Sequence, residues 1–466
     1  MFDNDILMQF RENDAFICSD GSRYKYSEIL NFSQQISNSI PTRSLIFSKC
    51  TNSPGSIIGY VSFILSRSVP LLLKRDIDEE MLRNLIETYE PEYIWMPEED
   101  FDDKVEGEVV LNFLGYSLVR FSTDGKTVMH DDLAILLTTS GSTGSPKLVK
   151  LSYKNLESNA KSIADYLSLG EEERPITTLP MNYSFGLSII NSHLTRGSTI
   201  VLTDSSLMEK SFWSLIEWSK ATSLSGVPYT FEILKRLRFS SIDLPYLKTM
   251  TQAGGRLSTE LHREFAELCV ERGIRFFVMY GQTEATARMS YLPPEKSLEK
   301  IGSVGIAIPG GEFHLIREDG ERIERIREQG ELVYEGGNVS MGYATTLGDL
   351  RTGDENRGIL FTGDLAERDE DGFLFIVGRK NRFIKIFGNR INLDDIEEMV
   401  RKVVPECACI GKDDKMTIFI TREEMVMQVK KFISSKTKLN QSSIEVCFVE
   451  FIPKNTSGKT LYSELK

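Results

Sequence analysis

Residues 136–150 read LLTTSGSTGSPKLVK. The nine positions 138–146 are all Thr, Ser, Gly or Pro, and a lysine follows them. An apolar run at 133–137 has the length of a buried strand, and 148–151 has the pattern of a second one. Ser152 can cap a helix that follows, because apolar residues recur beyond it at helical spacing. The polar segment is therefore predicted to be a turn held between core elements.

This turn has two interpretations. Clusters of Gly, Ser and Thr between periodic segments are usually ordinary loops. In contrast, Gly141 and Gly144 allow successive backbone N–H groups to converge on one point, and the four hydroxyls of residues 140–147 add further donors. Because core strands are expected on both sides, we predict that the turn binds phosphate.

The composition is that of a soluble globular protein with two or three domains: 466 residues, 41% hydrophobic and 26% charged. No apolar run reaches the roughly 18 residues of a membrane span, and Arg67 interrupts the longest candidate. The N-terminus lacks the basic region of a secretory signal. The six cysteines are scattered without a CxxC pair, and the four histidines are far apart in the sequence. These features disfavour disulfides and structural zinc and predict a cytoplasmic protein without a membrane span.

The net charge of −13 disfavours a nucleic-acid partner, because phosphate backbones repel such a surface. The charge is unevenly distributed, however. Residues 379–466 contain 17 Lys and Arg against 12 Asp and Glu, whereas the rest of the chain is strongly acidic. This asymmetry predicts a separate C-terminal lobe that meets anions, although ordinary variation in surface charge gives the same pattern.

Short apolar runs alternate with helical patterns before about residue 375, which predicts α/β layers with parallel strands. From Glu312 onward, turn signals and alternation indicate antiparallel hairpins. From Arg379 the pattern changes to a basic strand-like stretch, a helix capped by Asn392, and further strands and a helix. We therefore predict two domains, residues 1–378 and a compact α+β domain at 379–466.

The tripeptide Gly458-Lys459-Thr460 resembles the end of a Walker A loop. The first glycine of that motif is replaced by Pro453, and the six residues after Thr460 are too few for the helix that must follow. A Walker A site is therefore excluded, and by itself Lys459 is no more than a solvated lysine.

Several segments taken together are more informative than any one of them. They are SGSTGSPK at 140–147, YGQTE at 280–284, GSVGIAIPG at 302–310, GELVYEGGNVSMGY at 330–343, TGDL at 362–365, GRKNRFIKIFGNRI at 378–391 and PKNTSGK at 453–459. Their order and spacing resemble the adenylate-forming superfamily, which includes acyl-CoA synthetases, aryl-acid ligases, luciferases and non-ribosomal peptide adenylation domains. The resemblance runs from about residue 26 to residue 459. It implies a large N-terminal domain of layered α/β subdomains with a β-barrel-like part, followed by a small mobile α+β domain.

The resemblance also implies a reaction. In this superfamily a carboxylate attacks the α-phosphorus of ATP, which gives acyl-AMP and pyrophosphate, and a thiol then takes the acyl group. Both reactants of the first step are anions, so the site must neutralise and hold charge. The implied ligands are ATP and Mg²⁺, a small carboxylic acid, and CoA or a phosphopantetheine thiol.

Residue roles follow from the same resemblance. Residues 140–147 would cover the β- and γ-phosphates, Tyr280 would stack on adenine, and Asp364 would accept the ribose hydroxyls with help from Arg379. The full set implied to contact ATP is Thr139, Ser140, Gly141, Ser142, Thr143, Gly144, Lys147, Gly254, Gly255, Tyr280, Gly281, Gln282, Asp364 and Arg379.

Three residues are implied to be catalytic. Thr283 would contact the α-phosphate, and Glu284 would ligate Mg²⁺, since a hard cation prefers carboxylate oxygen. Lys459 would contact both the attacking carboxylate and the α-phosphate. By analogy with the loss of one preorganised donor, removal of Lys459 is expected to cost roughly 3–4 kcal/mol, or about 10²–10³ in rate.

The small domain carries residues implied to act in the second step. Asn381 occupies the hinge position, and Lys385 and Gly388 lie where the superfamily lines its thiol tunnel. A narrow passage requires backbone without a Cβ, so the glycine favours an enzyme that forms a thioester.

The acid pocket is expected from the segments 180–188, 226–230 and 252–258, with Tyr183, Phe185, Gly186, Val227 and Pro228 as lining residues. Superfamily members that activate amino acids place an aspartate in the first segment to hold the ammonium group. This chain has no acidic residue at 180–188, and an uncompensated buried ammonium is costly. We therefore expect a small acyl or aryl acid without an α-amino group.

The leading prediction is an AMP-forming acid–thiol ligase that makes an acyl-CoA. The runner-up loads the acid onto a carrier-protein phosphopantetheine, because residues 411–421 lack much of the usual small-lobe hairpin. Transfer to an amine remains open. A catalytically silent nucleotide-binding protein is disfavoured by the presence of both Glu284 and Lys459.

Overall fold

The computed structural model describes residues 4–101, 107–121, 127–138, 147–387, 389–412, 414–454 and 460–465, without the side chains of residues 389 and 390. The chain divides into two compact units, residues 1–313 with 334–360 and residues 314–333 with 361–466. The predicted boundary between residues 378 and 379 falls inside the second unit, and it stays a prediction of where a mobile lobe begins.

One sheet of the first unit contains eight strands among the described residues. Its central strands β8, β4, β3 and β5 are parallel to one another, and the others are antiparallel to their neighbours. In sheet order the strands are β19 (Gly342–Ala344), β9 (Leu148–Ser152), β8 (Leu133–Thr138), β4 (Val69–Lys74), β3 (Leu45–Cys50), β5 (Tyr93–Pro97), β7 (Tyr116–Arg120) and β6 (Glu108–Phe113). The two strands predicted on either side of residues 139–146 are confirmed as the antiparallel pair β8 and β9.

The second sheet of this unit contains nine strands among the described residues. Five consecutive pairings from β1 to β14 are parallel, which confirms the predicted α/β class. In sheet order the strands are β16 (Ile306–Ala307), β15 (Ser290–Leu292), β14 (Arg275–Tyr280), β13 (Thr249–Gln252), β12 (Ser223–Gly226), β10 (Pro175–Ile176), β11 (Ile200–Leu202), β1 (Asp14–Cys18) and β2 (Arg23–Lys25).

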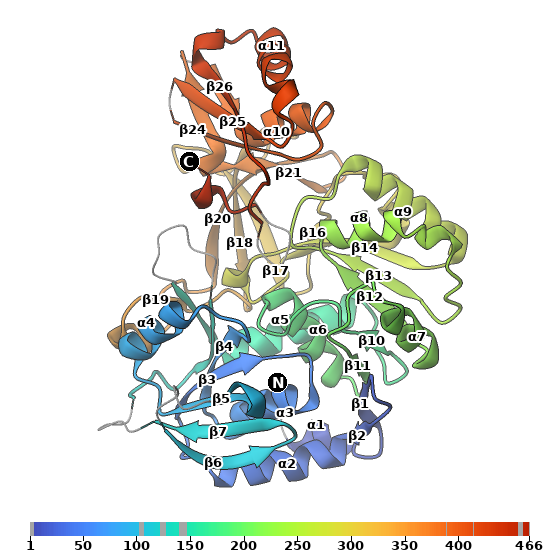
Figure 1. The fold of residues 1–466 in the computed structure, drawn as a ribbon, viewed down its shortest axis with the longest axis vertical. Helices are drawn as coiled ribbons and strands as arrows, with labels where there is room; N and C mark the ends of the chain where they lie inside the picture. Colours follow the sequence, from blue (N-terminus) through green and yellow to red (C-terminus); the bar gives the residue numbers. More distant parts are fainter. Residues whose placement is uncertain are drawn as a thin grey trace. The chain divides into compact units, whose positions relative to one another are not determined.

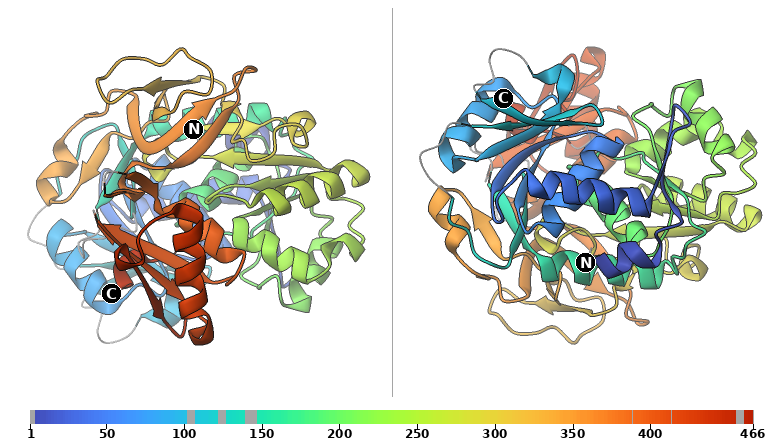
Figure 2. Two further views of the ribbon diagram at one scale, coloured as in Figure 1. Left: turned by 90° about the horizontal axis from the view of Figure 1, so that it is seen from above. Right: turned by 90° about the horizontal axis from the view of Figure 1, so that it is seen from below.

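Helices of the first unit pack on and between these sheets (Figure 1). Residues of α2, α3, α5 and α6 belong to one apolar cluster that also contains strands of both sheets, and α2 runs through the middle of this unit when seen from below (Figure 2). The helices are α1 (Asn4–Gln9), α2 (Tyr26–Asn38), α3 (Pro54–Leu65), α4 (Glu79–Tyr89), α5 (Tyr153–Tyr166), α6 (Ser184–Leu194), α7 (Lys210–Trp218), α8 (Pro228–Arg236) and α9 (Thr259–Arg272). Among the described residues, no helix has both the length and the apolar character needed to cross a membrane.

Two helix starts predicted from the sequence are confirmed by their caps. The Ser152 side chain accepts a hydrogen bond from Asn155 N at the start of α5, and the Asn155 side chain accepts one from Ser152 N. Asn392 likewise accepts from Asp394 N at the start of α10 (Leu393–Arg401). Such caps satisfy backbone donors that have no partner within the helix.

The second unit consists mainly of β-structure, with two helices among its described residues. Its four-stranded sheet consists of β17 (Gly311–Ile316), β18 (Gly330–Gly336), β20 (Ile359–Arg368) and β21 (Leu374–Arg379). Strands β17, β18 and β20 run across the division between the units. A hairpin of β22 (Phe383–Ile386) and β23 (Asn389–Asn392) follows. The sheet of β24 (Cys407–Lys412), β25 (Lys415–Ile420) and β26 (Ile444–Phe448) shares its core with α10 and with α11 (Val426–Thr437). This arrangement confirms the predicted compact α+β domain, although the sequence did not reveal β24.

Tyr26 connects α2 to the end of α6, and its replacement tests the junction between the two sheets. Its buried hydroxyl donates to Ser198 O at 2.7 Å and lies 3.3 Å from Leu194 O. We expect Tyr26→Phe to lower the free energy of unfolding by about 1–3 kcal/mol, because buried acceptors lose their donor. Urea denaturation would measure the change. The matched control Tyr229→Phe, at an exposed position, should stay within about 0.5 kcal/mol of wild type. Equal effects of the two changes would contradict this account.

Candidate active site

Most of the site residues predicted in the first unit follow the carboxyl ends of neighbouring parallel strands. Val227 comes directly after β12, Gly254 follows β13, and Gly281 follows β14. Tyr183 lies on the connection from β10 to α6 and is the N-cap residue of that helix. Strands β10, β12, β13 and β14 are consecutive neighbours in the sheet, and all are parallel. Their carboxyl ends therefore lie along one edge, which is where open α/β sheets bind ligands.

The glycines in these loops allow close approaches. A Cβ at Gly281 would overlap the carbonyl oxygen of Ala287. Gly254 has φ +83°, and a Cβ there would lie 2.5 Å from the Tyr183 hydroxyl. Gly255 is exposed and lies beside Pro228 at the start of α8. A side chain at Gly254 or Gly281 would therefore force the loops apart or strain the backbone.

Thr283 and Glu284 lie on a short 3-10 turn, η3 (Thr283–Ala285), whose side chains are fixed from two sides. The Thr283 hydroxyl lies 3.1 Å from the Ser184 hydroxyl at the start of α6. Oε1 of Glu284 accepts a hydrogen bond from the Tyr343 hydroxyl at 2.9 Å. Ser340 N also donates to Glu284 O at 2.8 Å. Both predicted catalytic side chains are therefore held in defined directions.

Tyr343 was not predicted as a site residue, although it ends the motif at 330–343. Its hydroxyl binds Glu284, and the Lys147 ammonium lies 5.1 Å from the centre of its ring. Partial burial and the neighbouring carboxylate raise the pKa of Tyr343, so the hydroxyl keeps its proton and acts as a donor. Tyr343 therefore connects Glu284 with the lysine that ends the predicted phosphate turn.

The backbone that follows Glu284 is strained. Thr286 has φ +67° and ψ −50°, and Ala287 N donates to Ala285 O at 2.7 Å. These values define a classic γ-turn, a rare conformation that persists only when surrounding contacts hold it.

Asn338 supplies those contacts. Its Nδ2 donates to Ala285 O at 2.9 Å and to Arg288 O at 3.0 Å, and its own carbonyl accepts from the Thr286 hydroxyl at 2.7 Å. Its Oδ1 accepts from the buried Tyr334 hydroxyl at 2.8 Å. The residue thus uses its amide and its backbone to hold the turn that carries Thr283 and Glu284.

The predicted acid-pocket residues come together at the start of α6. The rings of Tyr183 and Phe185 lie edge to face, 6.4 Å apart. A Cβ at Gly186 would overlap the carbonyl oxygen of Pro180. Phe185 and Val227 belong to one buried apolar cluster, against which Tyr183 packs. The residues predicted to line the acid pocket are therefore aromatic and aliphatic.

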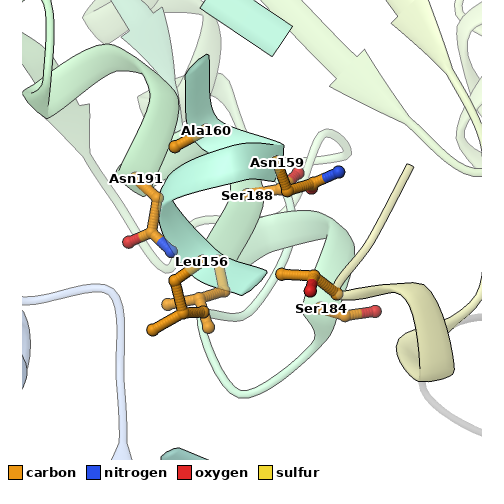
Figure 3. A pocket seen from close by; sticks show the side chains of 8 residues that line it. Leu156, Asn159, Ala160, Ser184, Ser188 and Asn191 are labelled. Atoms are coloured by element: carbon orange, nitrogen blue, oxygen red, sulfur yellow. The ribbon is translucent and has the colours of Figure 1, made fainter. Parts of the chain in front are cut away.

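A separate small cavity lies between α5 and α6 and extends to the strained turn (Figure 3). Its volume of about 10 Å³ is room for about one water molecule, too little for a substrate. The residues that line it are Leu156, Asn159, Ala160, Ser184, Leu187, Ser188, Asn191 and Thr286.

In the second unit, two residues predicted to contact ATP lie next to each other. Asp364 on β20 and Arg379 on β21 are directly opposite in register, with 3.3 Å between Oδ1 and Nε. Asp364 is buried and Arg379 exposed. Asn381 lies in the short turn η6 (Lys380–Arg382), and the Lys385 side chain on β22 is exposed.

Eight predicted residues lie outside the described part of the chain: Thr139, Ser140, Gly141, Ser142, Thr143, Gly144, Gly388 and Lys459. The described residues that flank the segment 455–459 form defined contacts. Lys454 and Thr460 form an antiparallel bridge, and Leu461 N donates to Pro453 O at 2.8 Å. The ring of Tyr462 lies 4.1 Å from the guanidinium of the buried Arg382.

Residues 9–344 match the family described as AMP-binding enzyme, and the chain belongs to this family. Among curated relatives, 2-succinylbenzoate–CoA ligase of Geobacillus sp. (strain WCH70) is 29% identical over 386 residues, which cover 79% of this chain and 76% of the relative. The predicted class, an AMP-forming acid–thiol ligase of the adenylate-forming superfamily, is confirmed.

Solved structures confirm the predicted fold. O-succinylbenzoate coenzyme A synthetase of Bacillus subtilis in complex with ATP and magnesium ion has a TM-score of 0.80 at 22% identity, over 99% of this chain and 98% of that one. The same enzyme in complex with its acyl-adenylate intermediate has a TM-score of 0.79 at 22% identity, over 99% and 97%.

Replacement of Asn338 tests the role of the strained turn. We expect Asn338→Ala to lower the free energy of unfolding by about 1–3 kcal/mol, because buried backbone carbonyls lose their donor. We also expect ATP–pyrophosphate exchange to fall by up to about 10²-fold, since displaced catalytic groups lose their alignment.

The matched control is Asn13→Ala, which removes hydrogen bonds to Gly197 O and Glu171 far along the sequence from this turn. It should change stability with little effect on exchange. If Asn338→Ala loses stability and keeps the wild-type exchange rate, the turn does not depend on this support.

Proposed function

We propose that the chain activates a small carboxylic acid with ATP, releasing pyrophosphate, and then passes the acyl group from acyl-AMP to the thiol of CoA. The observation that carries this proposal is the turn at 283–284. It presents a hydroxyl and a carboxylate in fixed directions, and it lies at the edge of a parallel sheet beside the apolar cluster that contains Phe185 and Val227. Family membership supports the same reaction.

Charge is the main obstacle in the first step, because a carboxylate must approach a triphosphate. In the proposal, Thr283 contacts the α-phosphate and residues 140–147 hold the β- and γ-phosphates. Lys459 neutralises both the carboxylate and the α-phosphate. Donors fixed before the reaction begins stabilise developing charge without reorganisation. The hydrogen bond of Thr283 to Ser184 is an arrangement of this kind.

Glu284 is the residue proposed to hold Mg²⁺. Magnesium is usually bound through one or two carboxylates together with substrate phosphates, so a single carboxylate fits this chemistry. The Tyr343 hydroxyl uses Oε1 of Glu284 and fixes the direction of the carboxylate. When bound, the ion neutralises charge on the phosphate oxygens.

The nucleoside is proposed to bind through two sets of residues. Tyr280 stacks on adenine, with Gly254, Gly255, Gly281 and Gln282 forming the loops around it. Asp364 accepts the ribose hydroxyls with Arg379 beside it. The 3.3 Å ion pair of these two residues supports this role, since Arg379 fixes the direction of the buried carboxylate.

For the second step, we propose Asn381 as a hinge, with Lys385 and Gly388 along the thiol path. CoA is the favoured acceptor because the curated relatives are named CoA ligases. The short connection between β24 and β25 favours the alternative acceptor, the phosphopantetheine of a carrier protein. Turnover with free CoA compared with a holo-carrier separates the two.

The acid is proposed to lack an α-amino group. Tyr183, Phe185, Gly186, Val227 and Pro228 supply an apolar or aromatic lining without a carboxylate. A cytoplasmic location suits the six free cysteines.

Replacement of Lys459 separates the two steps. We expect Lys459→Ala to lower ATP–pyrophosphate exchange by about 10²–10³, because one preorganised cation is lost, while a supplied acyl-AMP is still converted to the thioester. Mass spectrometry of the product would measure the second step. The matched control is Lys454→Ala, which removes an exposed lysine paired with Glu406 and should leave both steps unchanged.

The same exchange assay over a panel of acids tests the reaction itself. The wild type should exchange pyrophosphate with acids that lack an α-amino group. Exchange with amino acids alone would refute the proposed substrate class. A folded wild type without exchange for any acid would support a silent nucleotide-binding protein instead.

A further inference from the structure

The side chain of Arg288 is a buried cation without a carboxylate partner among the described residues. It is 2% exposed and ranks among the largest fully buried side chains. Its Nη1 donates to the Tyr166 hydroxyl at 2.9 Å, and its Nε has no partner in the part of the chain that the structure describes. None of the described Asp and Glu residues forms an ion pair with it. A guanidinium does not lose its proton in proteins, so this charge is permanent.

A comparison within the chain shows that this is unusual. Arg382 is also buried, but its Nε lies 2.8 Å from Asp394 and its Nη2 lies 2.7 Å from Glu397. Lys150, which is fully buried, is paired with Glu355 at 3.1 Å. Buried charges are normally paired in this way, because an uncompensated charge in the interior is strongly destabilising. At Arg288 the described residues supply no compensating anion.

The surroundings of Arg288 are those of the proposed acid pocket. Its guanidinium carbon lies 5.0 Å from the ring centre of Phe185, a predicted pocket residue. It also contacts the sulfur of Met279, which belongs to the same apolar cluster as Phe185 and Val227. Arg288 ends the turn that begins with Thr283, so the groups proposed to bind phosphate and this cation come from one short segment.

The described groups around Arg288 do not neutralise it. The Phe185 ring and the Tyr166 hydroxyl offer weak, uncharged contacts. His193 lies nearby, with Nδ1 bonded to Ile189 O at 2.8 Å and Nε2 without a partner among the described residues. Burial lowers the pKa of His193 to about 4, and the charge of Arg288 acts in the same direction. The imidazole is therefore neutral, and it does not offset the positive charge of Arg288.

We propose that Arg288 binds a second anionic group on the acid, so that the substrate is a dicarboxylic acid activated at the carboxylate remote from Arg288. This inference rests on the proposed function and specifies its substrate class. A guanidinium presents paired N–H donors that match both oxygens of a carboxylate. A cation in the pocket also repels an α-ammonium group, in agreement with the lack of an acidic residue at 180–188.

The test uses pairs of substrates that differ in one charge. Each pair is a diacid and its half-amide of equal length, with the distal carboxylate converted to the amide. The diacids are aliphatic chains of increasing length and aromatic keto-diacids, of which 2-succinylbenzoate is one. With ATP–pyrophosphate exchange as the readout, kcat/KM of the wild type should favour the best diacid over its half-amide by roughly 100-fold or more.

Variants of Arg288 then assign the preference to this residue. In Arg288→Met the ratio of kcat/KM for diacid over half-amide should fall to near one, with the loss mainly in KM for the diacid. Arg288→Lys keeps the positive charge but lacks the paired N–H donors of a guanidinium. Its ratio should therefore lie between those of Arg288→Met and the wild type. Tyr166→Phe removes a neutral partner of Arg288 and keeps its charge, so the ratio should remain high. A thermal melt of each variant checks that it is folded.

The outcomes are distinct. Equal kcat/KM of the wild type for half-amides and diacids would overturn the inference. This comparison tests the inference even if Arg288→Met does not fold. Equal losses for both substrates in a folded Arg288→Met show a purely structural arginine and also overturn it. Failure of the proposed function looks different, because the wild type then exchanges pyrophosphate with no acid of either kind.

Discussion

The hydrogen bonds between Asn338 and the turn at 283–288 are the constraint on which the rest of the site depends. The turn includes a γ-turn at Thr286, a conformation that non-glycine residues avoid unless their surroundings fix it. Asn338 forms hydrogen bonds with two carbonyls and one hydroxyl of this turn. Asn159 on α5 donates to Arg288 O from another side. Through this support, one short segment directs Thr283 toward α6, Glu284 toward Tyr343 and Arg288 into the apolar cluster.

The parallel sheet provides the frame for that segment. Strands β10, β12, β13 and β14 end together, so residues far apart in the sequence meet at one edge. Burial of apolar residues in the cluster around Phe185 then fixes the walls beside the turn. In the second unit, Asp364 and Arg379 meet for a simpler reason, because they face each other on adjacent antiparallel strands.

Part of this arrangement could be predicted from short stretches of the sequence. The strands on both sides of residues 139–146, the Ser152 cap and the Asn392 cap follow from patterns of a few neighbouring residues. Other features depend on contacts across the chain, and no local pattern reveals them. The hydrogen bond between Tyr343 and Glu284 joins residues 59 positions apart in the sequence, and that between Asn338 and Ala285 joins residues 53 positions apart.

Because Thr283, Glu284 and Arg288 share one rigid turn, the spacing between them is fixed by backbone geometry and not by the pocket walls. The apolar cluster beside the turn is formed instead by residues of α5, α6, β14 and the loops between them. If the proposed function holds, the length and bulk of the accepted acid can change through substitutions in α6, during divergence or in a redesign, without displacing the proposed catalytic residues of the turn. In the proposal, the charge of the accepted acid is selected separately, by the single residue Arg288 within the turn.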